Sequence, residues 1–208
     1  MSVTIPIEKQ YDSEGFAKFV EIEKCKPGNE NNRYELIDGC IYMMGSPNMT
    51  HYNIADFIEQ IFKRYFENKG CRVLHAPVDL FLFDKRRTKL VGLPKVKIKN
   101  VVVPDLMVVC SQTQIKNKGI YGAPELIVEV VSESNPENDY IRKLNAYHMF
   151  GIKEYCIVNP IKKNVRIYDL SIFNNPQEYN YTFENIVKSE IFSGLYVDFK
   201  QFTGFVVE

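Results

Sequence analysis

The stretch that most constrains the fold is 101–150, because two of its apolar runs each carry a carboxylate. Asp105 follows Pro104 between VVV and LMVV, and Glu129 lies inside the run LIVEVV at 126–131. A core strand is normally apolar throughout, and a charged side chain is rarely buried unless it is paired or binds a metal. Two such acids on neighbouring strands therefore favour a functional site at this point of the fold.

Structural explanations compete with this interpretation. Asp105 could cap a turn after Pro104, and Glu129 could lie on an exposed face of a sheet. Lys143, in the helix expected after the second acidic strand, could pair with Asp139 on a solvated helix face. The functional alternative is a divalent-metal phosphodiesterase centre, in which Asp105 and Glu129 bind the metal and Lys143 stabilises developing charge.

Length and charge set the outer limits. The chain has 208 residues, 45% hydrophobic and 25% charged, with a formal net charge of zero. We therefore expect one globular domain spanning 1–208. Any attraction to nucleic acid must come from a local patch. No segment approaches the ~18 apolar residues of a membrane span, and the first residues lack an apolar leader, so a cytoplasmic protein without a membrane partner is expected.

Cysteines and known motifs exclude several classes. The five cysteines are odd in number and show no C-x-x-C spacing, which favours a reducing compartment and argues against a disulfide frame or a zinc knuckle. The chain also lacks a Walker loop, a serine elbow and a G-x-G-x-x-G fingerprint. Serine hydrolases and the common nucleotide-binding folds are therefore not the leading interpretations.

The N-terminal half predicts two helices and a hairpin. A first helix is expected at 12–24 with Asp12 or Ser13 as N-cap, and Asp38-Gly39 predicts a two-residue turn between short strands. A long helix is expected from Thr50 to about residue 68, ending at Gly70. Strand material follows at 71–83.

The C-terminal half predicts a βαβ unit. A strand at 101–110 is interrupted at Asp105, 111–123 is expected to be a loop, and a buried strand covers 125–131. Asn135 is expected to cap a helix that ends before Gly151, and an apolar strand follows at 154–158. This order favours parallel pairing, followed by an antiparallel strand at 164–170 and a hairpin around 174–176. The fold class is therefore α/β, with a mixed sheet and helices on its faces.

A basic segment precedes the first acidic strand. Seven lysines and arginines, without an acid, lie between positions 85 and 99, namely Lys85, Arg86, Arg87, Lys89, Lys95, Lys97 and Lys99. The last three alternate with β-branched residues, which predicts that they share one face of a strand. They could protect a sheet edge from aggregation. They could equally form a hairpin insertion at about 84–100 that contacts nucleic-acid phosphates.

The order of several separated motifs resembles a known family. RYELIDGCIYMM, SPNMTHYNIADFI, VVVPDLMVVC and GAPELIVEVVSESNPENDYIRKLNAYHMFGIKEYCIVNP follow one another from residue 33 to about residue 170. This series resembles the Uma family, described as putative restriction endonucleases, which belongs to the PD-(D/E)XK nuclease superfamily. The resemblance implies a restriction-endonuclease-like core, a mixed β-sheet flanked by helices, that binds one or two Mg²⁺ (or Mn²⁺) ions.

The resemblance also implies roles for particular residues. Asp105 matches the aspartate of the PD motif, and Glu129 matches the acid of the (D/E)-x-K motif, although position 131 is valine. Lys143 occupies the place of the lysine, which has moved to the following helix. Glu35 matches the acid of the early YELIDG motif and would complete the metal shell. His51 and Tyr147 fit the pattern as accessory residues, as does Asp139.

The expected function is a metal-dependent DNA endonuclease, with DNA as partner and a homodimer by analogy. The catalytic set would be Asp105, Glu129, Lys143 and Glu35, and the nucleic-acid contacts would come from Lys95, Lys97, Lys99, Arg86 and Arg87. The rival interpretation is a non-catalytic DNA-binding or assembly protein that retains the nuclease fold. The family's usual residues differ at Cys156 and Asn159, where a tryptophan and an aspartate are common.

Overall fold

Two six-stranded sheets form the frame of the protein, as seen in a computed structural model that describes residues 10–83, 97–132 and 136–204. The first sheet has the order β2-β1-β5-β4-β8-β7 and the second β12-β11-β10-β9-β6-β3. Both contain parallel and antiparallel pairs. The mixed α/β class is confirmed, although one mixed sheet was expected. None of the described helices is long and apolar enough to cross a membrane.

The strands are short, and their bounds are as follows. The first sheet consists of β1 (Tyr34–Ile37), β2 (Cys40–Met43), β4 (Leu80–Leu82), β5 (Asn100–Val102), β7 (Ile115–Lys116) and β8 (Gly119–Tyr121). The second consists of β3 (Arg72–His75), β6 (Leu106–Val109), β9 (Leu126–Val130), β10 (Glu154–Asn159), β11 (Asn164–Asp169) and β12 (Gln177–Thr182). A separate C-terminal hairpin pairs β13 (Ile186–Lys188) with β14 (Tyr196–Asp198).

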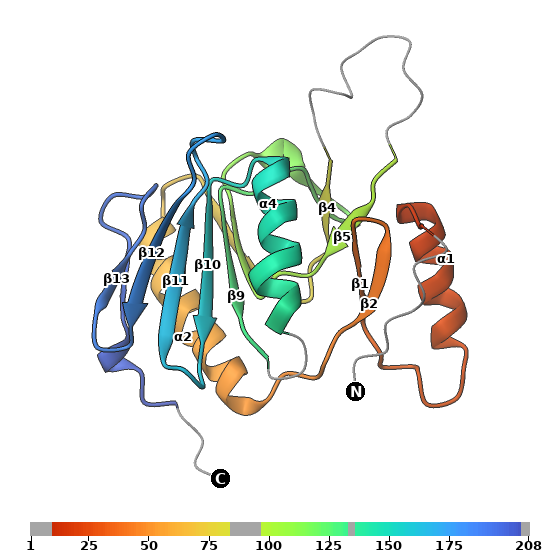
Figure 1. The fold of residues 1–208 in the computed structure, drawn as a ribbon, viewed down its shortest axis with the longest axis horizontal. Helices are drawn as coiled ribbons and strands as arrows, with labels where there is room; N and C mark the ends of the chain where they lie inside the picture. Colours follow the sequence, from red (N-terminus) through yellow and green to blue (C-terminus); the bar gives the residue numbers. More distant parts are fainter. Residues whose placement is uncertain (1–9, 84–96, 133–135, 205–208) are drawn as a thin grey trace.

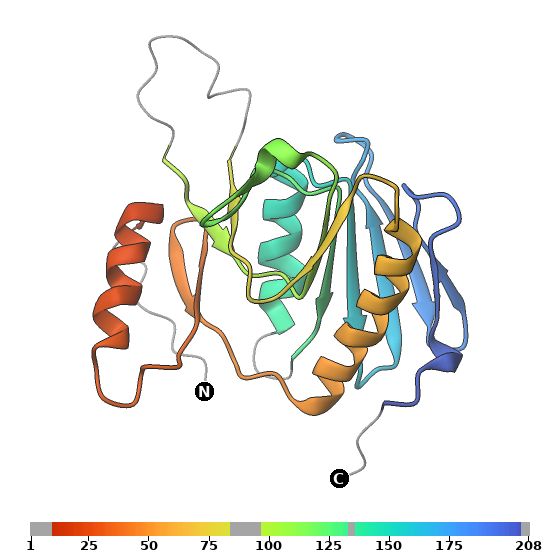
Figure 2. The same cartoon turned by 180° about the vertical axis from the view of Figure 1, so that it is seen from behind.

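Helices cover both faces of the second sheet (Figures 1 and 2). Helix α2 (Met49–Phe66) and the C-terminal hairpin pack on one face, against side chains such as Val128 of β9 and Val158 of β10. Helix α4 (Leu144–Phe150) packs on the opposite face, against Ile127 and Ile157 of the same strands. Alternate residues of each strand therefore enter two different cores, which explains why these strands are apolar along their whole length.

Local turn and cap signals mostly agree with the structure. Asp38 (φ 48°) and Gly39 (φ 79°) form the two-residue turn between β1 and β2, as predicted. Asp12 caps α1 (Ser13–Lys24) by accepting a hydrogen bond from Gly15 N, also as predicted.

The ends of the long helix differ from the prediction. Asn48, not Thr50, caps α2 by accepting a hydrogen bond from His51 N. The helix ends at Phe66, and the first left-handed residue after it is Asn68 (φ 62°) rather than Gly70. Asparagine tolerates this backbone region, because its short polar side chain can bond locally, and the helix therefore does not need to reach the glycine.

The strand predicted at 101–110 is two strands in different sheets. β5 belongs to the first sheet and β6 to the second, and residues 103–105 carry the chain between them. The prediction that 111–123 is a loop is wrong, because β7 and β8 extend the first sheet here, with β8 parallel to β4. Their few residues were too short to show a periodic pattern.

The βαβ unit is confirmed, with one irregularity. β9 and β10 pair in parallel, and the intervening helix ends at Gly151 (φ 85°) as predicted. Its first part, Asn138–Lys143, is a π-helical stretch that precedes α4. The expected cap residue Asn135 lies outside the described residues. β11 and β12 then add antiparallel strands, which confirms the hairpin expected around 174–176.

One pair of cysteines contradicts the expectation that the chain has no disulfide. Cys71 and Cys110 form a disulfide bond across 39 residues of sequence. In the antiparallel β3–β6 ladder Arg72 lies opposite Val109, and the residues just beyond this pair are Cys71 and Cys110. The pairing of these two strands is not visible in the spacing of the cysteines. Cys25, Cys40 and Cys156 are free.

Candidate active site

The candidate site lies where the two sheets meet. β1 of the first sheet carries Glu35, and β9 of the second carries Glu129. Asp105 immediately precedes β6, in the segment that links the sheets. Because β6 pairs with β9 and Leu106 lies opposite Val128, Asp105 is adjacent to the Glu129 end of this ladder. The prediction that the two acidic strands are neighbours is therefore confirmed.

Glu129 points toward the face of the second sheet that α4 covers, and two donors hold it there. Lys143 Nζ lies 3.0 Å from Glu129 Oε1, and the Tyr147 hydroxyl donates to the same oxygen at 2.9 Å. The side chains of Glu129 and Lys143 are only 4% and 5% exposed. The alternatives of an exposed sheet face for Glu129 and a solvated helix face for Lys143 are therefore wrong.

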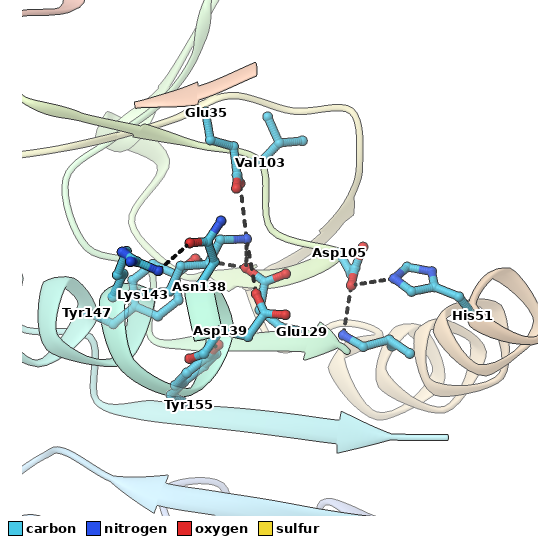
Figure 3. A network of polar contacts seen from close by, with 12 residues as sticks. Glu35, His51, Val103, Asp105, Glu129, Asn138, Asp139, Lys143, Tyr147 and Tyr155 are labelled. Atoms are coloured by element: carbon cyan, nitrogen blue, oxygen red, sulfur yellow. Dashed lines mark hydrogen bonds and ion pairs between the residues drawn. The ribbon is translucent and has the colours of Figure 1, made fainter. Parts of the chain in front are cut away.

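Glu35 brings a second carboxylate to the same ammonium. Glu35 Oε1 lies 3.0 Å from Lys143 Nζ and also accepts a hydrogen bond from Val103 N at 2.8 Å. Asp139 Oδ1 is 3.5 Å from the same Nζ. One buried ammonium thus links carboxylates from both sheets and from its own helix, as Figure 3 shows.

The π-helical stretch sets the direction of the helical side chains. Asp139 and Lys143 belong to it, Tyr147 follows in α4, and all three are buried. The Tyr155 hydroxyl donates to the backbone carbonyl of Asp139 at 3.1 Å, which ties this turn to β10. π-helical turns occur frequently at functional sites, but sequence spacing does not distinguish them from ordinary helix.

Asp105 and His51 form a second part of the site, on the α2 side of the network in Figure 3. His51 Nε2 lies 3.0 Å from Asp105 Oδ2, and Val130 N donates to the same oxygen at 2.7 Å. Asp105 therefore satisfies the backbone of a neighbouring strand rather than a local turn. Burial lowers the pKa of His51, but the bond to the Asp105 carboxylate outweighs it and raises that pKa above its usual value.

A cavity of about 260 Å³ opens between these two parts. Its polar lining includes Glu35, Asp105, Glu129 and Asp139, together with Arg33, Glu59, His75, Ser132 and Asn138. Apolar side chains of Met43, Met44, Tyr52 and Ala55 complete the wall. The sequence-based prediction gave no functional role to Arg33, Tyr52, Glu59 or His75. No pattern in the sequence points to these residues, because they reach the cavity from separate elements.

The site carries an excess of buried negative charge. Burial, and then the neighbouring carboxylates, raise the pKa of Glu129 well above its usual value, although Lys143 opposes the shift. The same causes raise the pKa of Asp139 to about 6. Burial alone would lower the pKa of Lys143, but Glu129, Glu35 and Asp139 raise it, and the ammonium stays charged. Four carboxylates, from Glu35, Asp105, Glu129 and Asp139, outnumber the two cationic or basic side chains that they contact, those of Lys143 and His51, so this cluster favours additional positive charge.

Glu35, Asp105 and Glu129 are the residues expected to bind a metal. Within the described residues, no group of three or more His, Cys, Asp or Glu side chains is arranged to hold a metal ion, and the acids converge instead on Lys143 and His51. The donors around Lys143 Nζ are carboxylate oxygens, the type that Mg²⁺ and Mn²⁺ prefer. An ammonium cation already lies between Glu35 and Glu129. The carboxylates around Lys143 Nζ therefore match a divalent cation in their donor chemistry, although an ammonium lies between them.

The basic segment is described only in part. Lys85, Arg86, Arg87, Lys89 and Lys95 lie outside the described residues. Lys97 Nζ is 3.4 Å from Asp12, and Lys99 donates to Gln10 at 2.6 Å, so both contact the residues that precede α1. β5 begins only at Asn100, and the prediction that these lysines lie within a strand is therefore wrong for Lys97 and Lys99.

Comparisons with known proteins agree with this architecture. The chain is 23% identical over 140 residues to the uncharacterized protein slr1290 of Synechocystis sp., an alignment that covers 67% of each chain. A crystal structure described as a putative nuclease belonging to DUF820, from Anabaena variabilis, superposes with a TM-score of 0.65. At 17% identity it covers 91% of this chain and 96% of that one, and it shows the shared fold.

The family assignment rests on a match over most of the chain. A family model described as "Uma2: Putative restriction endonuclease" matches residues 16–200. The matched range includes Glu35, Asp105, Glu129 and Lys143. The chain therefore belongs to the Uma2 family of putative restriction endonucleases.

Proposed function

We propose that this protein is a divalent-metal-dependent DNA endonuclease that uses Mg²⁺ or Mn²⁺. The observation that carries the proposal is the convergence of Glu35 and Glu129, from two different sheets, on one buried lysine, with Asp105 across the same cavity. Buried acids of this density are costly unless positive charge is supplied. Membership in a family described as putative restriction endonucleases supports phosphodiester hydrolysis as the chemistry.

In this proposal Asp105, Glu129 and Glu35 would hold the metal. The chemistry that a bound divalent cation supplies is neutralisation of the phosphate charge and a lowered pKa of a coordinated water. The protein supplies the positions of the ligands. Tyr147 holds Glu129 and Val103 N holds Glu35, so each carboxylate keeps one fixed orientation.

The remaining residues of the site would act on the attacking water and the phosphate. Val130 N and His51 fix Asp105 from two directions. Lys143 is charged and lies within the same cavity, from which it would orient the water or stabilise the developing negative charge. An ammonium in a largely desolvated site has a stronger effect on such charge than one in water.

DNA is the proposed substrate. Lys95, Lys97, Lys99, Arg86 and Arg87 would contact its phosphates, and the 76% exposure of the Lys97 side chain leaves it accessible despite its contact with Asp12. Cutting both strands of a duplex usually needs two centres, so a homodimer is part of the proposal. Light scattering on the purified protein, with and without a short duplex, measures that state.

The test is a nicking assay on supercoiled plasmid with Mg²⁺ or Mn²⁺. The parent should nick, and Asp105→Ala and Lys143→Ala should each lose the activity. Lys200→Ala is the matched control, because Lys200 pairs with Glu184 on the surface, away from the cavity. Nicking that survives in all variants would assign the activity elsewhere.

The rival function, a DNA-binding or assembly protein that retains the nuclease fold, predicts a different result. It requires duplex binding without nicking at any concentration of either metal. Gel-shift measurements on the same proteins then separate the two functions, because duplex binding by a parent that does not nick fits only the rival function.

A further inference from the structure

We infer that the Lys143 ammonium is the resting counter-ion of the metal position between Glu35 and Glu129, and that Asp139 is the positioning residue that keeps this ammonium when a divalent cation takes its place. The inference rests on the metal dependence in the proposed function. It adds an exchange of two cations at one position, and a role for an acid that the proposed ligand set does not use.

The position between Glu35 and Glu129 cannot hold both the Lys143 ammonium and a divalent cation. Lys143 Nζ lies 3.0 Å from Glu35 Oε1 and 3.0 Å from Glu129 Oε1. A divalent cation held by the same two carboxylates would lie close to Nζ, because Nζ already contacts both of them. Like charges at such a distance repel strongly in a buried site. Binding of the metal between these acids therefore requires the ammonium to move.

The Lys143 ammonium stabilises the buried carboxylates when no metal is bound. Glu35, Glu129 and Asp139 are each buried, and a buried carboxylate without a counter-charge is costly. Lys143 contacts all three. The lysine thus stabilises the metal-free protein at the same oxygens that the metal would use.

Asp139, on the same helical segment, is another partner for the displaced ammonium. Asp139 precedes Lys143 by four residues, and its Oδ1 is already 3.5 Å from Nζ. The Tyr155 hydroxyl donates to the backbone carbonyl of Asp139 and anchors this turn, while the lysine side chain is long enough to rotate toward the Asp139 carboxylate. A shift of the ammonium toward Asp139 therefore keeps a buried ionic partner and frees the oxygens of Glu35 and Glu129.

The arrangement has a consequence opposite to that of an ordinary catalytic lysine. Removal of Lys143 should strengthen metal binding, because the competing cation is gone. Removal of Asp139 should weaken metal binding chiefly through Lys143, because the ammonium then has no alternative partner. Both effects concern binding, and neither needs turnover to be measured.

The experiment is titration of the whole protein with Mn²⁺ at pH 8, with free Mn²⁺ measured by electron paramagnetic resonance and melting temperature recorded in parallel. Lys143→Met should bind Mn²⁺ at least about tenfold more tightly than the parent, a difference of about 1.4 kcal/mol. Lys143→Gln, which keeps a polar donor without the charge, should show the same direction and decides the question if the methionine variant does not fold. Lys200→Met is the control and should bind as the parent does.

A double-mutant cycle tests the role of Asp139. Asp139→Asn should lower Mn²⁺ affinity in the parent and lower it much less in the Lys143→Met background. An equal loss in both backgrounds would make Asp139 a direct ligand and overturn its positioning role. Replacement of Lys143 that leaves Mn²⁺ affinity unchanged or weaker, or absence of Mn²⁺ binding in all variants, would overturn the exchange.

These outcomes are separate from those of the nicking assay. Tighter Mn²⁺ binding by the Lys143 variants without any nicking by the parent would reject the endonuclease and leave the cation exchange standing. Nicking by the parent, together with unchanged Mn²⁺ affinity in the Lys143 variants, would support the endonuclease and overturn the cation exchange.

Discussion

Two buried glutamates on adjacent strands of the second sheet meet very different surroundings. Glu129 of β9 faces the helix that carries Lys143, and Glu154 of β10 faces the opposite core beneath the C-terminal hairpin. Both are nearly inaccessible, at 3% and 1% exposure. Their burial is thus equal, and the comparison isolates what surrounds each carboxylate.

Neutral donors satisfy Glu154. Its Oε2 accepts hydrogen bonds from Ser189 Oγ, Glu190 N and Ile191 N at 3.0, 2.7 and 3.1 Å. Burial raises its pKa to about 7, although these bonds oppose the shift. Glu129 instead shares a cation with two other acids and lines a cavity. In this fold, therefore, a buried acid belongs to the candidate site where it has a cationic partner and also lines the large cavity.

The largest difference should appear in nicking activity. Glu129→Gln keeps the shape and the Tyr147 contact but removes a charged ligand, and plasmid nicking should fall by about 10²-fold or more. Glu154→Gln, the matched change on the other face, should nick at the rate of the parent. Equal losses in the two variants would show that the comparison reflects folding rather than chemistry, and circular dichroism of both variants provides that control.

The next effect is on stability against pH. Glu154 has a folded pKa of about 7 against an ordinary value of 4.5, so the folded state binds its proton more tightly than the unfolded state. This contribution to the free energy of unfolding is fully present below pH 4.5 and is lost as pH rises to 7, a change of about 3 kcal/mol. Urea melts of the parent relative to Glu154→Gln should show this loss between pH 4.5 and 7. Parallel curves for the two proteins would contradict it.

The sequence marked one of these two acids and not the other. Glu129 stands between Val128 and Val130, where no local explanation applies, and this conflict identified it. Glu154 opens its strand after Lys153 and looks like an ordinary strand end. Its burial depends on the loop at 189–191, 35 residues or more away, and a contact over this distance produces no periodic pattern in the sequence.

The dependence of burial on contacts between distant residues also explains which parts of the site the sequence predicted. The order of motifs identified Asp105, Glu129, Lys143 and Glu35, and the structure brings all four to one cavity. The solvated pairing considered for Lys143 failed, because α4 packs against the sheet and the spacing of four residues is the same for buried and exposed pairs. The passage of the chain between sheets at 103–105 was likewise invisible, since an interrupted strand has one sequence pattern whether its halves share a sheet or separate.

A smaller effect should follow from removing one hydroxyl beside each acid. Tyr147→Phe deletes the donor to Glu129, and Ser189→Ala deletes one of three donors to Glu154. The free energy of unfolding should fall by about 2 kcal/mol in the first case and about 1 kcal/mol in the second, because Glu154 keeps two backbone donors. Urea midpoints measure both losses. A larger loss for Ser189→Ala would contradict the view that Glu129 has the more demanding environment.

The smallest effect should come from lysines that are exposed rather than buried. The Lys143 ammonium is buried and paired with carboxylates, whereas the Lys97 side chain is 76% exposed and its Nζ lies 3.4 Å from the Asp12 carboxylate. If Lys97 and Lys99 reach DNA phosphates, the alanine variant of both should lower the slope of log affinity against log salt by about 1 per lysine. Filter binding from low to moderate salt measures this slope, with Lys200→Ala as the control. An unchanged slope would restrict these two lysines to anchoring the segment before α1, and the proposed phosphate contacts would then depend on Arg86, Arg87 and Lys95.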